Sequence, residues 1–316
     1  MRVVLGIDAA WTERQPSGVA LVVDDGTGWR LLAAEASYGH FISVAHGNRP
    51  HGDPVGTLPN AHDLIEAARL LAGQAPDLVA IDMPLSREPI TERRCADTAI
   101  SLTFGAQWCS THTPSTLRPG KISDDLSSGF AALGYPLCTE TIVAPGLIEV
   151  YPHPALVRLT DEPKRLPYKV AKASRYWPKS LPEDRRLALL GEWGSIATVL
   201  EAYVKGTDER LMASSILGTR PKNLKAREDM IDAVICCVVG IRALDGKAQP
   251  FGNSDAAIWV PERDEAMLER ILLPSSPYSR RAEMQAEVFA DALARGEYSE
   301  RLNCAKHDTQ QGEYQR

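Results

Sequence analysis

Two short apolar runs, each ending in an aspartate, constrain the fold of this chain most strongly. Residues 3–7 are apolar or glycine and end at Asp8, and residues 78–81 are apolar throughout and end at Asp82. A short continuous apolar run indicates a strand buried on both faces, and such strands usually lie parallel inside a sheet that helices cover. The sequence therefore predicts an α/β protein in which two core strands end in carboxylates.

Apolar periodicity and turn residues divide the chain into a mixed order of strands and helices. We expect strands at 3–8, 18–23 and 29–37 as an antiparallel meander, a mobile loop at 39–59, a helix at 60–71 capped by Asn60, a strand at 78–82 and a helix at 91–104. We further expect a strand at 147–150, an end of regular structure at 151–154, helices at 184–203 and 227–244, and an edge strand at 255–260. This order predicts a mixed sheet with helices on both faces.

The length allows one large domain or two smaller ones. With 316 residues, of which 44% are apolar, the chain can bury a sizeable core. We expect a domain over residues 1–261, with a helical insertion at about 158–221 where prolines interrupt a basic segment. We expect residues 262–316 to form a C-terminal helical extension and polar tail.

Composition excludes several classes of protein. The longest apolar runs, such as 233–239, are too short to span a bilayer, and the N-terminus lacks the apolar stretch of a signal peptide. The six cysteines include no C-x-x-C pair, which argues against a structural zinc site or a disulfide scaffold. We therefore expect a cytoplasmic protein without a membrane segment. Its net charge of −6 requires any nucleic-acid site to be a local basic patch.

Acidic residues recur in positions that predict burial. Asp8 and Asp82 end strands, Glu149 lies within another short strand, and Asp229 and Asp232 share one side of the apolar helix at 227–244. An unpaired buried carboxylate is costly, and a divalent cation such as Mg²⁺ or Mn²⁺ removes the repulsion within a group of them. For any one of these aspartates a turn or helix cap is the simpler interpretation. Taken together, Asp8, Asp82 and Asp232 favour a metal site.

Several ordered segments carry a resemblance to a known family. They are 6–11 (GIDAAW), 17–20 (SGVA), 81–85 (IDMPL), 93–97 (RRCAD), 149–154 (EVYPHP), 229–233 (DMIDA) and 257–261 (AIWVP). This set resembles the domain of unknown function 429 family, whose members are described as predicted nucleases of the ribonuclease H-like fold. The resemblance implies that Asp8, Asp82 and Asp232 hold the metals with Asp229 as a neighbour, and that Glu149 is a further ligand or base.

Basic and polar residues supply candidate substrate contacts. Residues 158–186 contain nine basic and four acidic residues with interleaved aromatics, a composition that suits a phosphate backbone and exposed bases. The candidate contacts are Lys169, Lys172, Arg175, Arg93, Arg94 and His153. For Lys169, Lys172 and Arg175 taken singly, a solvated surface is the simpler interpretation. A pair with Asp97 explains Arg93 or Arg94 equally well, and a structural role explains His153 equally well. A second basic stretch at 220–227 precedes the acidic pair.

Three functions compete at this stage. The first is a metal-dependent nuclease, in which Asp8 bridges the metals and water attacks a phosphodiester. The second is a phosphotransferase of the actin-like superfamily, but the sequence has no Walker-type loop and no glycine-rich adenosine segment between residues 119 and 261. The third is a non-catalytic module that binds nucleic acid or protein. The choice between DNA and RNA, and the oligomeric state, stay open.

Overall fold

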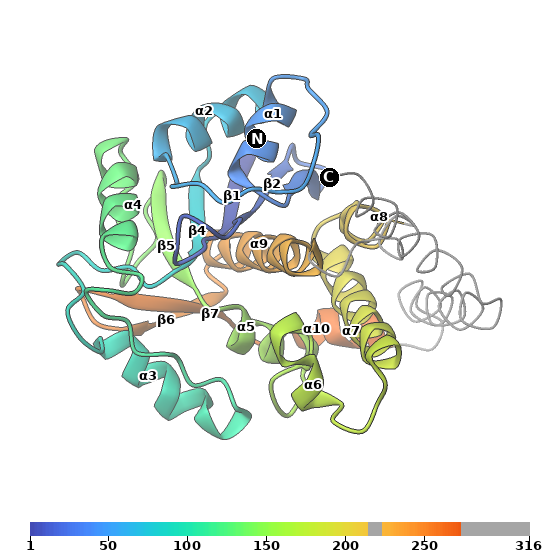
Figure 1. The fold of residues 1–316 in the computed structure, drawn as a ribbon. Helices are drawn as coiled ribbons and strands as arrows, with labels where there is room; N and C mark the ends of the chain where they lie inside the picture. Colours follow the sequence, from blue (N-terminus) through green and yellow to red (C-terminus); the bar gives the residue numbers. More distant parts are fainter. Residues whose placement is uncertain (214–222, 273–316) are drawn as a thin grey trace, which may run out of the picture.

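A seven-stranded mixed sheet forms the centre of the protein, with strand order β3-β2-β1-β4-β5-β7-β6 (Figure 1). The structure is a computed structural model that describes residues 1–213 and 223–272. The strands are β1 (Arg2–Asp8), β2 (Gly18–Asp24), β3 (Trp29–Glu35), β4 (Leu78–Asp82), β5 (Gly146–Val150), β6 (Ala248–Gly252) and β7 (Ala257–Pro261). β4, β5 and β7 run parallel to β1, whereas β2, β3 and β6 pair with antiparallel neighbours.

Helices cover both faces of the sheet (Figure 1). α1 (Tyr38–Ala45), α2 (Ala61–Ala72) and α4 (Lys121–Ala132) pack on one face, and α5 (Pro152–Thr160), α7 (Pro182–Tyr203) and α9 (Leu224–Leu244) pack on the other. Alternate residues of β1 enter the two cores: Val3 and Leu5 face the first layer, and Val4 faces the second. The prediction of an α/β protein with a mixed sheet and two helical layers is confirmed.

The remaining helices are shorter or peripheral. They are α3 (Cys95–Phe104), α6 (Ala173–Tyr176), α8 (Thr207–Leu211), α10 (Glu265–Leu272) and the 3₁₀ turns η1 (Gly105–Gln107) and η2 (Val170–Lys172). Between β5 and α9, where the helical insertion is predicted, α5 to α8 are described, while residues 214–222 lie outside the described ranges. The predicted extension begins with α10, and residues 273–316 lie outside those ranges as well. Within the described chain, no helix combines the length and hydropathy needed to cross a bilayer.

Local sequence signals placed α2 correctly. The Asn60 side chain accepts hydrogen bonds from the backbone N–H groups of His62 and Asp63 at 3.0 and 3.3 Å, and Gly73 ends the helix in a left-handed conformation. The predicted strands at 3–8 and 78–82 and the predicted helices at 184–203 and 227–244 also match β1, β4, α7 and α9 within a few residues.

Three local predictions were wrong. The expected loop at 39–59 begins instead with α1, because Tyr38 and Phe41 lie on the helix face that packs on the sheet. The prolines at 152 and 154 start α5 rather than ending regular structure, since proline is tolerated in the first turn of a helix. The expected edge strand at 255–260 is the interior strand β7, and the edge is β6, which pairs with it.

Candidate metal centre

The strand ends of β1 and β4 place two aspartates side by side. β1 and β4 are parallel neighbours, and their register pairs Asp8 with Asp82. Because parallel strands end at the same edge of a sheet, both carboxylates reach the same side of the molecule. The predicted meeting of these two strand ends is therefore a direct consequence of the parallel pairing.

The backbone of helix α9 lies very close to the backbones of β1 and β2, because the strands carry glycines where the helix crosses them. A Cβ on Gly18 of β2 would lie 1.9 Å from the carbonyl oxygen of Asp229, and a Cβ on Gly6 of β1 would lie 2.1 Å from that of Ala233. Real Cβ atoms do not approach backbone oxygens so closely. Gly6 and Gly18 therefore determine how near the acidic turn of α9 comes to Asp8.

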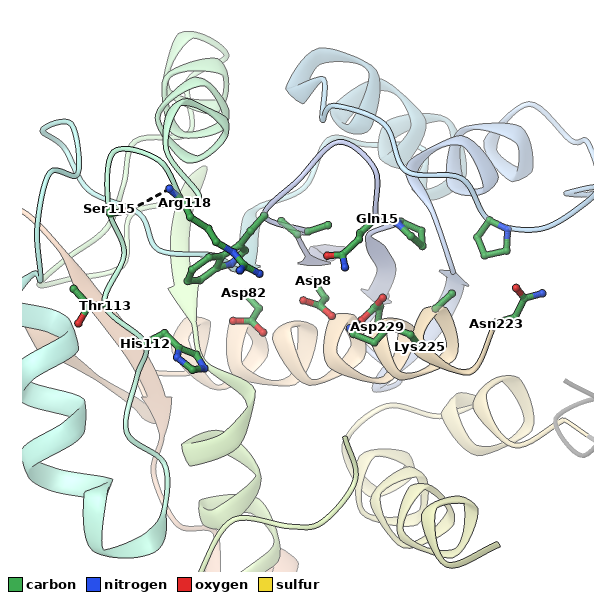
Figure 2. A pocket seen from close by; sticks show the side chains of 16 residues that line it. Asp8, Gln15, Asp82, His112, Thr113, Ser115, Arg118, Asn223, Lys225 and Asp229 are labelled. Atoms are coloured by element: carbon green, nitrogen blue, oxygen red, sulfur yellow. Dashed lines mark hydrogen bonds and ion pairs between the residues drawn. The ribbon is translucent and has the colours of Figure 1, made fainter. Parts of the chain in front are cut away.

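Three carboxylates converge where α9 meets β1, and Figure 2 shows two of them, those of Asp8 and Asp229. Asp8, Asp229 and Asp232 each offer one oxygen, and these three atoms lie within 4.8 Å of one another. Asp82 is not a member of this group of three but faces the same cleft. We call Asp8, Asp82, Asp229 and Asp232 the acidic cluster.

Burial and mutual repulsion disfavour ionisation of Asp8, Asp82 and Asp229. Loss of solvent, and then the charges of neighbouring aspartates, raise the pKa values of Asp8 and Asp82 well above the ordinary value. Burial also raises the pKa of Asp229 to about 6, although Lys225 and a hydrogen bond with Asp8 oppose that rise. The Asp82 carboxylate makes no hydrogen bond or ion pair with the residues that the structure describes.

Two lysines and a tyrosine contact the acidic cluster. Lys225 pairs with Asp229, and Lys169 pairs with Asp232, which also accepts a hydrogen bond from the Tyr168 hydroxyl at 2.7 Å. Both lysines reach the buried Glu228, at 3.2 Å from Lys169 and 3.4 Å from Lys225. Sequence reasoning missed Glu228, although its spacing of three residues from Lys225 and four from Asp232 places all three on neighbouring positions of one helix face.

The chemistry of the donor set fits a hard divalent cation. The acidic cluster and Glu228 supply five carboxylates against the two ammonium groups of Lys169 and Lys225, so an excess of negative charge is left. Oxygens that bind one metal ion at about 2.1 Å lie roughly 3 to 4 Å from one another. The oxygens of the three aspartates lie within 4.8 Å of one another, so small side-chain movements would bring them to that separation. Asp8, Asp229 and Asp232 are therefore the residues that would hold a metal ion.

A cleft of about 820 Å³ lies over the acids (Figure 2). Its walls come from four separate segments, the turn after β1, the loop before α2, the loop between α3 and α4, and the start of α9. Trp11 and Gln15 stand on one wall and His112 on another, and the Arg118 guanidinium lies 5.8 Å from the centre of the Trp11 ring. Sequence reasoning missed Arg118 as a residue of the cleft.

The structure places Glu149 and Arg94 together, apart from the group of three aspartates. The Arg94 guanidinium donates to both Glu149 oxygens at 2.5 and 2.8 Å and to Asp97 at 2.9 and 3.0 Å, and the Leu85 N–H donates to Glu149 at 2.7 Å. All three charged side chains are buried. Glu149 and Arg94 therefore satisfy each other, and Arg94 also makes the pair with Asp97 that the sequence left open as its other role.

The other predicted substrate contacts divide into two groups. Arg93 bonds to the Asp97 carbonyl at 2.8 Å and to the Ser101 and Thr113 hydroxyls at 2.6 and 3.1 Å, and so it supports a wall of the cleft. Lys169 is engaged with Asp232 and Glu228. Lys172 and Arg175 lie on η2 and α6. His153 is buried, and the centre of its ring lies 5.3 Å from that of Tyr151 and 5.4 Å from that of Tyr168.

Replacing Glu149 tests whether this residue is a metal ligand or only the ion-pair partner of Arg94. Glu149→Gln keeps the side-chain volume and one acceptor for Arg94 but removes the buried charge pair, so we expect a loss of about 2 kcal/mol in the free energy of unfolding. We also expect unchanged Mn²⁺ affinity, because Glu149 lies outside the three-aspartate group. Urea denaturation and calorimetric titration with Mn²⁺ measure the two effects. A tenfold loss of Mn²⁺ affinity in the folded variant would restore Glu149 as a ligand.

Stability in chelator should depend on pH through Asp229. Its folded pKa of about 6 exceeds the ordinary 3.8, so the folded state binds the proton more tightly than the unfolded state. That contribution to stability is present below pH 4 and is lost as the pH rises through about 6. Asn cannot ionise, so the stability of Asp229→Asn relative to the wild type should rise by about 2 kcal/mol between about pH 4.5 and 7.5. Urea denaturation at both pH values measures it, and a constant difference would contradict the assigned repulsion.

Comparison with known proteins identifies the family. The sequence model of a family described as a protein of unknown function, DUF429, matches residues 6–257. This chain belongs to the DUF429 family. The matched range contains β1, β4, β5 and α9, and therefore every member of the acidic cluster. Searches of curated proteins and of solved structures return no significant match.

Proposed function

We propose that this DUF429 protein hydrolyses phosphodiester bonds of nucleic acid with the help of Mg²⁺ or Mn²⁺. The observation that carries the proposal is the convergence of Asp8, Asp229 and Asp232 beside a cleft. Asp8, Asp82 and Asp229 line that cleft, and Asp232 is buried behind them. Carboxylate oxygens are the ligands that these cations prefer. A phosphodiester is an anion, and it approaches such an acidic floor only where cations neutralise the carboxylates.

We also propose that the sheet is of the ribonuclease H-like type. An antiparallel meander, β1 to β3, is followed by the parallel strands β4 and β5, and acids stand at the end of β1, at the end of β4 and on the late helix α9. This is the arrangement that the family resemblance implies. Here the sheet continues through β7 to the antiparallel edge strand β6.

The chain's own residues have distinct roles in this proposal. A bound divalent cation supplies a water of lowered pKa and neutralises charge on the phosphate. Asp8, Asp229 and Asp232 are the ligands, and Asp82, which has no partner in the described chain, is placed to accept the proton of the attacking water. Arg118 can donate N–H groups to a phosphate, and the face of Trp11 in the cleft wall suits stacking of an unpaired base.

One observation favours a second candidate function. Lys225 and Lys169 already pair with Asp229 and Asp232 without a cation. A binding module that retains the fold without catalysis would need only these internal pairs. The two functions differ in metal affinity, because the module requires no Mn²⁺. Calorimetric titration of the chelator-treated protein with Mn²⁺ separates them, and saturable binding favours the hydrolase.

Cleavage of defined substrates tests the hydrolase directly. Purified protein is incubated with single-stranded and duplex DNA and RNA, in chelator or with Mg²⁺ or Mn²⁺. We expect cleavage of at least one substrate only with the cation, and we expect Asp82→Asn to lower it by about 100-fold while the protein stays folded, because Asp82 holds no structural partner. Asp63→Asn, an exposed acid on α2, is the matched control and should leave the rate unchanged. Cleavage in chelator at the same rate would contradict the proposal.

A further inference from the structure

A concentration of positive charge lies beside the acidic cluster. Residues 164–175 carry the basic side chains of Lys164, Arg165, Lys169, Lys172 and Arg175 and contain no acidic residue. The backbone of this segment is held in place at three points. The Arg165 N–H bonds to the Gln107 carbonyl at 2.9 Å, the Trp193 indole bonds to the Tyr168 carbonyl at 2.8 Å, and the Val170 N–H bonds to Glu228 at 2.6 Å. The basic side chains therefore project from a fixed backbone.

Three of these cations lack an acidic partner. Lys169 pairs with Asp232 and Glu228, and Lys164 lies 4.6 Å from the centre of the Trp108 ring. Arg165, Lys172 and Arg175 make no ion pair anywhere in residues 1–213 and 223–272. They lie close enough to one another that burial, and then Arg165 and Arg175, lower the pKa of Lys172. Clustered cations without a counter-charge repel, and a bound anion would relieve that repulsion.

Buried polar atoms without partners occur at the same place. The Arg165 Nε and the His153 Nδ1 are both buried and lack a hydrogen-bond partner in the described structure. Burial, and then the charges of Lys169, Arg165 and Lys172, lower the pKa of His153. The Tyr176 hydroxyl lies within hydrogen-bond reach of Arg165, although burial raises its pKa. A buried polar group without a partner is costly, and two of them in one basic region indicate a missing ligand.

The basic side chains of residues 164–175 and the acidic cluster have contacts in common. Lys169, between Arg165 and Lys172 in the sequence, pairs with Asp232. Asp82 and Arg165 both act on Tyr151, whose pKa burial raises. An anion bound among the basic residues would therefore lie next to a phosphate held over the acids.

We propose that Arg165 and Lys172, with His153 and Tyr176, form a binding subsite for a phosphate group adjacent to the scissile one. An arginine fork and an ammonium group supply charge-assisted donors to a tetrahedral oxyanion, and the hydroxyl and imidazole supply neutral ones. Arg175, which is exposed, is placed to meet the next phosphate along the strand. The identity of the ligand as a substrate phosphate rests on the proposed function, whereas the ability of the subsite to bind phosphate does not.

Binding of inorganic phosphate tests the subsite without any cleavage reaction. Calorimetric titration is carried out in chelator, so that a metal ion cannot hold the phosphate. We expect saturable binding to the wild type, and a loss of affinity of roughly tenfold or more in Arg165→Gln and in Lys172→Gln. Lys179→Gln is the matched control, because Lys179 is an exposed basic residue of the same region, and its affinity should equal that of the wild type. Thermal melting shows that each variant is folded.

Two results would overturn the subsite. One is an absence of saturable phosphate binding by the folded wild type, and the other is an equal loss of affinity in Lys179→Gln and Lys172→Gln, which would indicate general charge attraction. The Asp8→Asn variant separates failure of the subsite from failure of the hydrolase. This substitution removes a proposed metal ligand but should leave the affinity for phosphate within twofold of the wild type. If phosphate binds as expected but no nucleic acid is cleaved, the subsite stands and the hydrolase fails.

Discussion

Asp8→Asn should lower metal-dependent hydrolysis by about 1000-fold or more, because Asp8 is the ligand that β1 contributes to the group of three carboxylates. The same change should make the chelator-treated protein more stable by about 1 to 2 kcal/mol at pH 7.5. Asn removes one of the charges whose burial and proximity to Asp229 and Asp232 raise the pKa of Asp8. A carboxylate that lowers the stability of the metal-free protein, and that hydrolysis requires when the metal is bound, is typical of a metal ligand.

Single-turnover cleavage and urea denaturation measure the two effects on the same preparation. The matched control is Asp63→Asn on α2, which removes an exposed charge far from the cluster in the sequence and should change neither quantity measurably. If Asp8→Asn cleaved at the wild-type rate, Asp8 would not be a ligand. If it were instead much less stable in chelator, Asp8 would be a structural acid whose charge the fold requires.

Gly18→Ala should destabilise the protein by at least about 3 kcal/mol, a larger effect than the expected cost of Glu149→Gln. The added Cβ would lie 1.9 Å from the carbonyl oxygen and 2.3 Å from the carbonyl carbon of Asp229. Both are backbone atoms of α9, so relief requires the whole helix to move away from β2. Such a movement separates Asp229 and Asp232 from Asp8, and Mn²⁺ affinity should fall with stability.

Gly191→Ala is the matched control for this substitution. Gly191 lies inside α7, and an added Cβ there meets nothing within 4 Å. Alanine should stabilise that helix by about 0.5 to 1 kcal/mol, because glycine is the poorer helix former. Urea denaturation of both variants gives the comparison. Equal stability of Gly18→Ala and the wild type would show that α9 does not approach β2 as closely as the structure has it.

The core elements were predictable because their signals are local. The apolar runs of β1 and β4 indicate strands without reference to the rest of the chain, and Asn60 marks the start of α2 by the hydrogen bonds that its own side chain accepts. The order of strands at the far edge was not predictable. Among the described strands β6 pairs with β7 alone, and the prediction of β7 as an edge strand failed because a neighbour on its other side is a tertiary property.

The candidate site was predictable to a similar extent. Asp8 and Asp82 could be brought together from sequence, because parallel strand ends share one edge of a sheet. The partner of Glu149 could not, since Arg94 lies 55 residues away and either residue had other plausible uses. The sequence did not indicate which basic residues form ion pairs. Lys169 pairs with Asp232, whereas Lys172 has no acidic partner in the described chain.

The central claim is that acids far apart in the sequence hold one divalent cation. A crystal of the protein soaked in Mn²⁺, with data collected to locate manganese by its anomalous scattering, tests it most directly. The account predicts a manganese peak bonded to oxygens of Asp8, Asp229 and Asp232 at about 2.2 Å. A fully soaked crystal in which manganese is bound elsewhere, while Lys225 and Lys169 keep their pairs with Asp229 and Asp232, would contradict it.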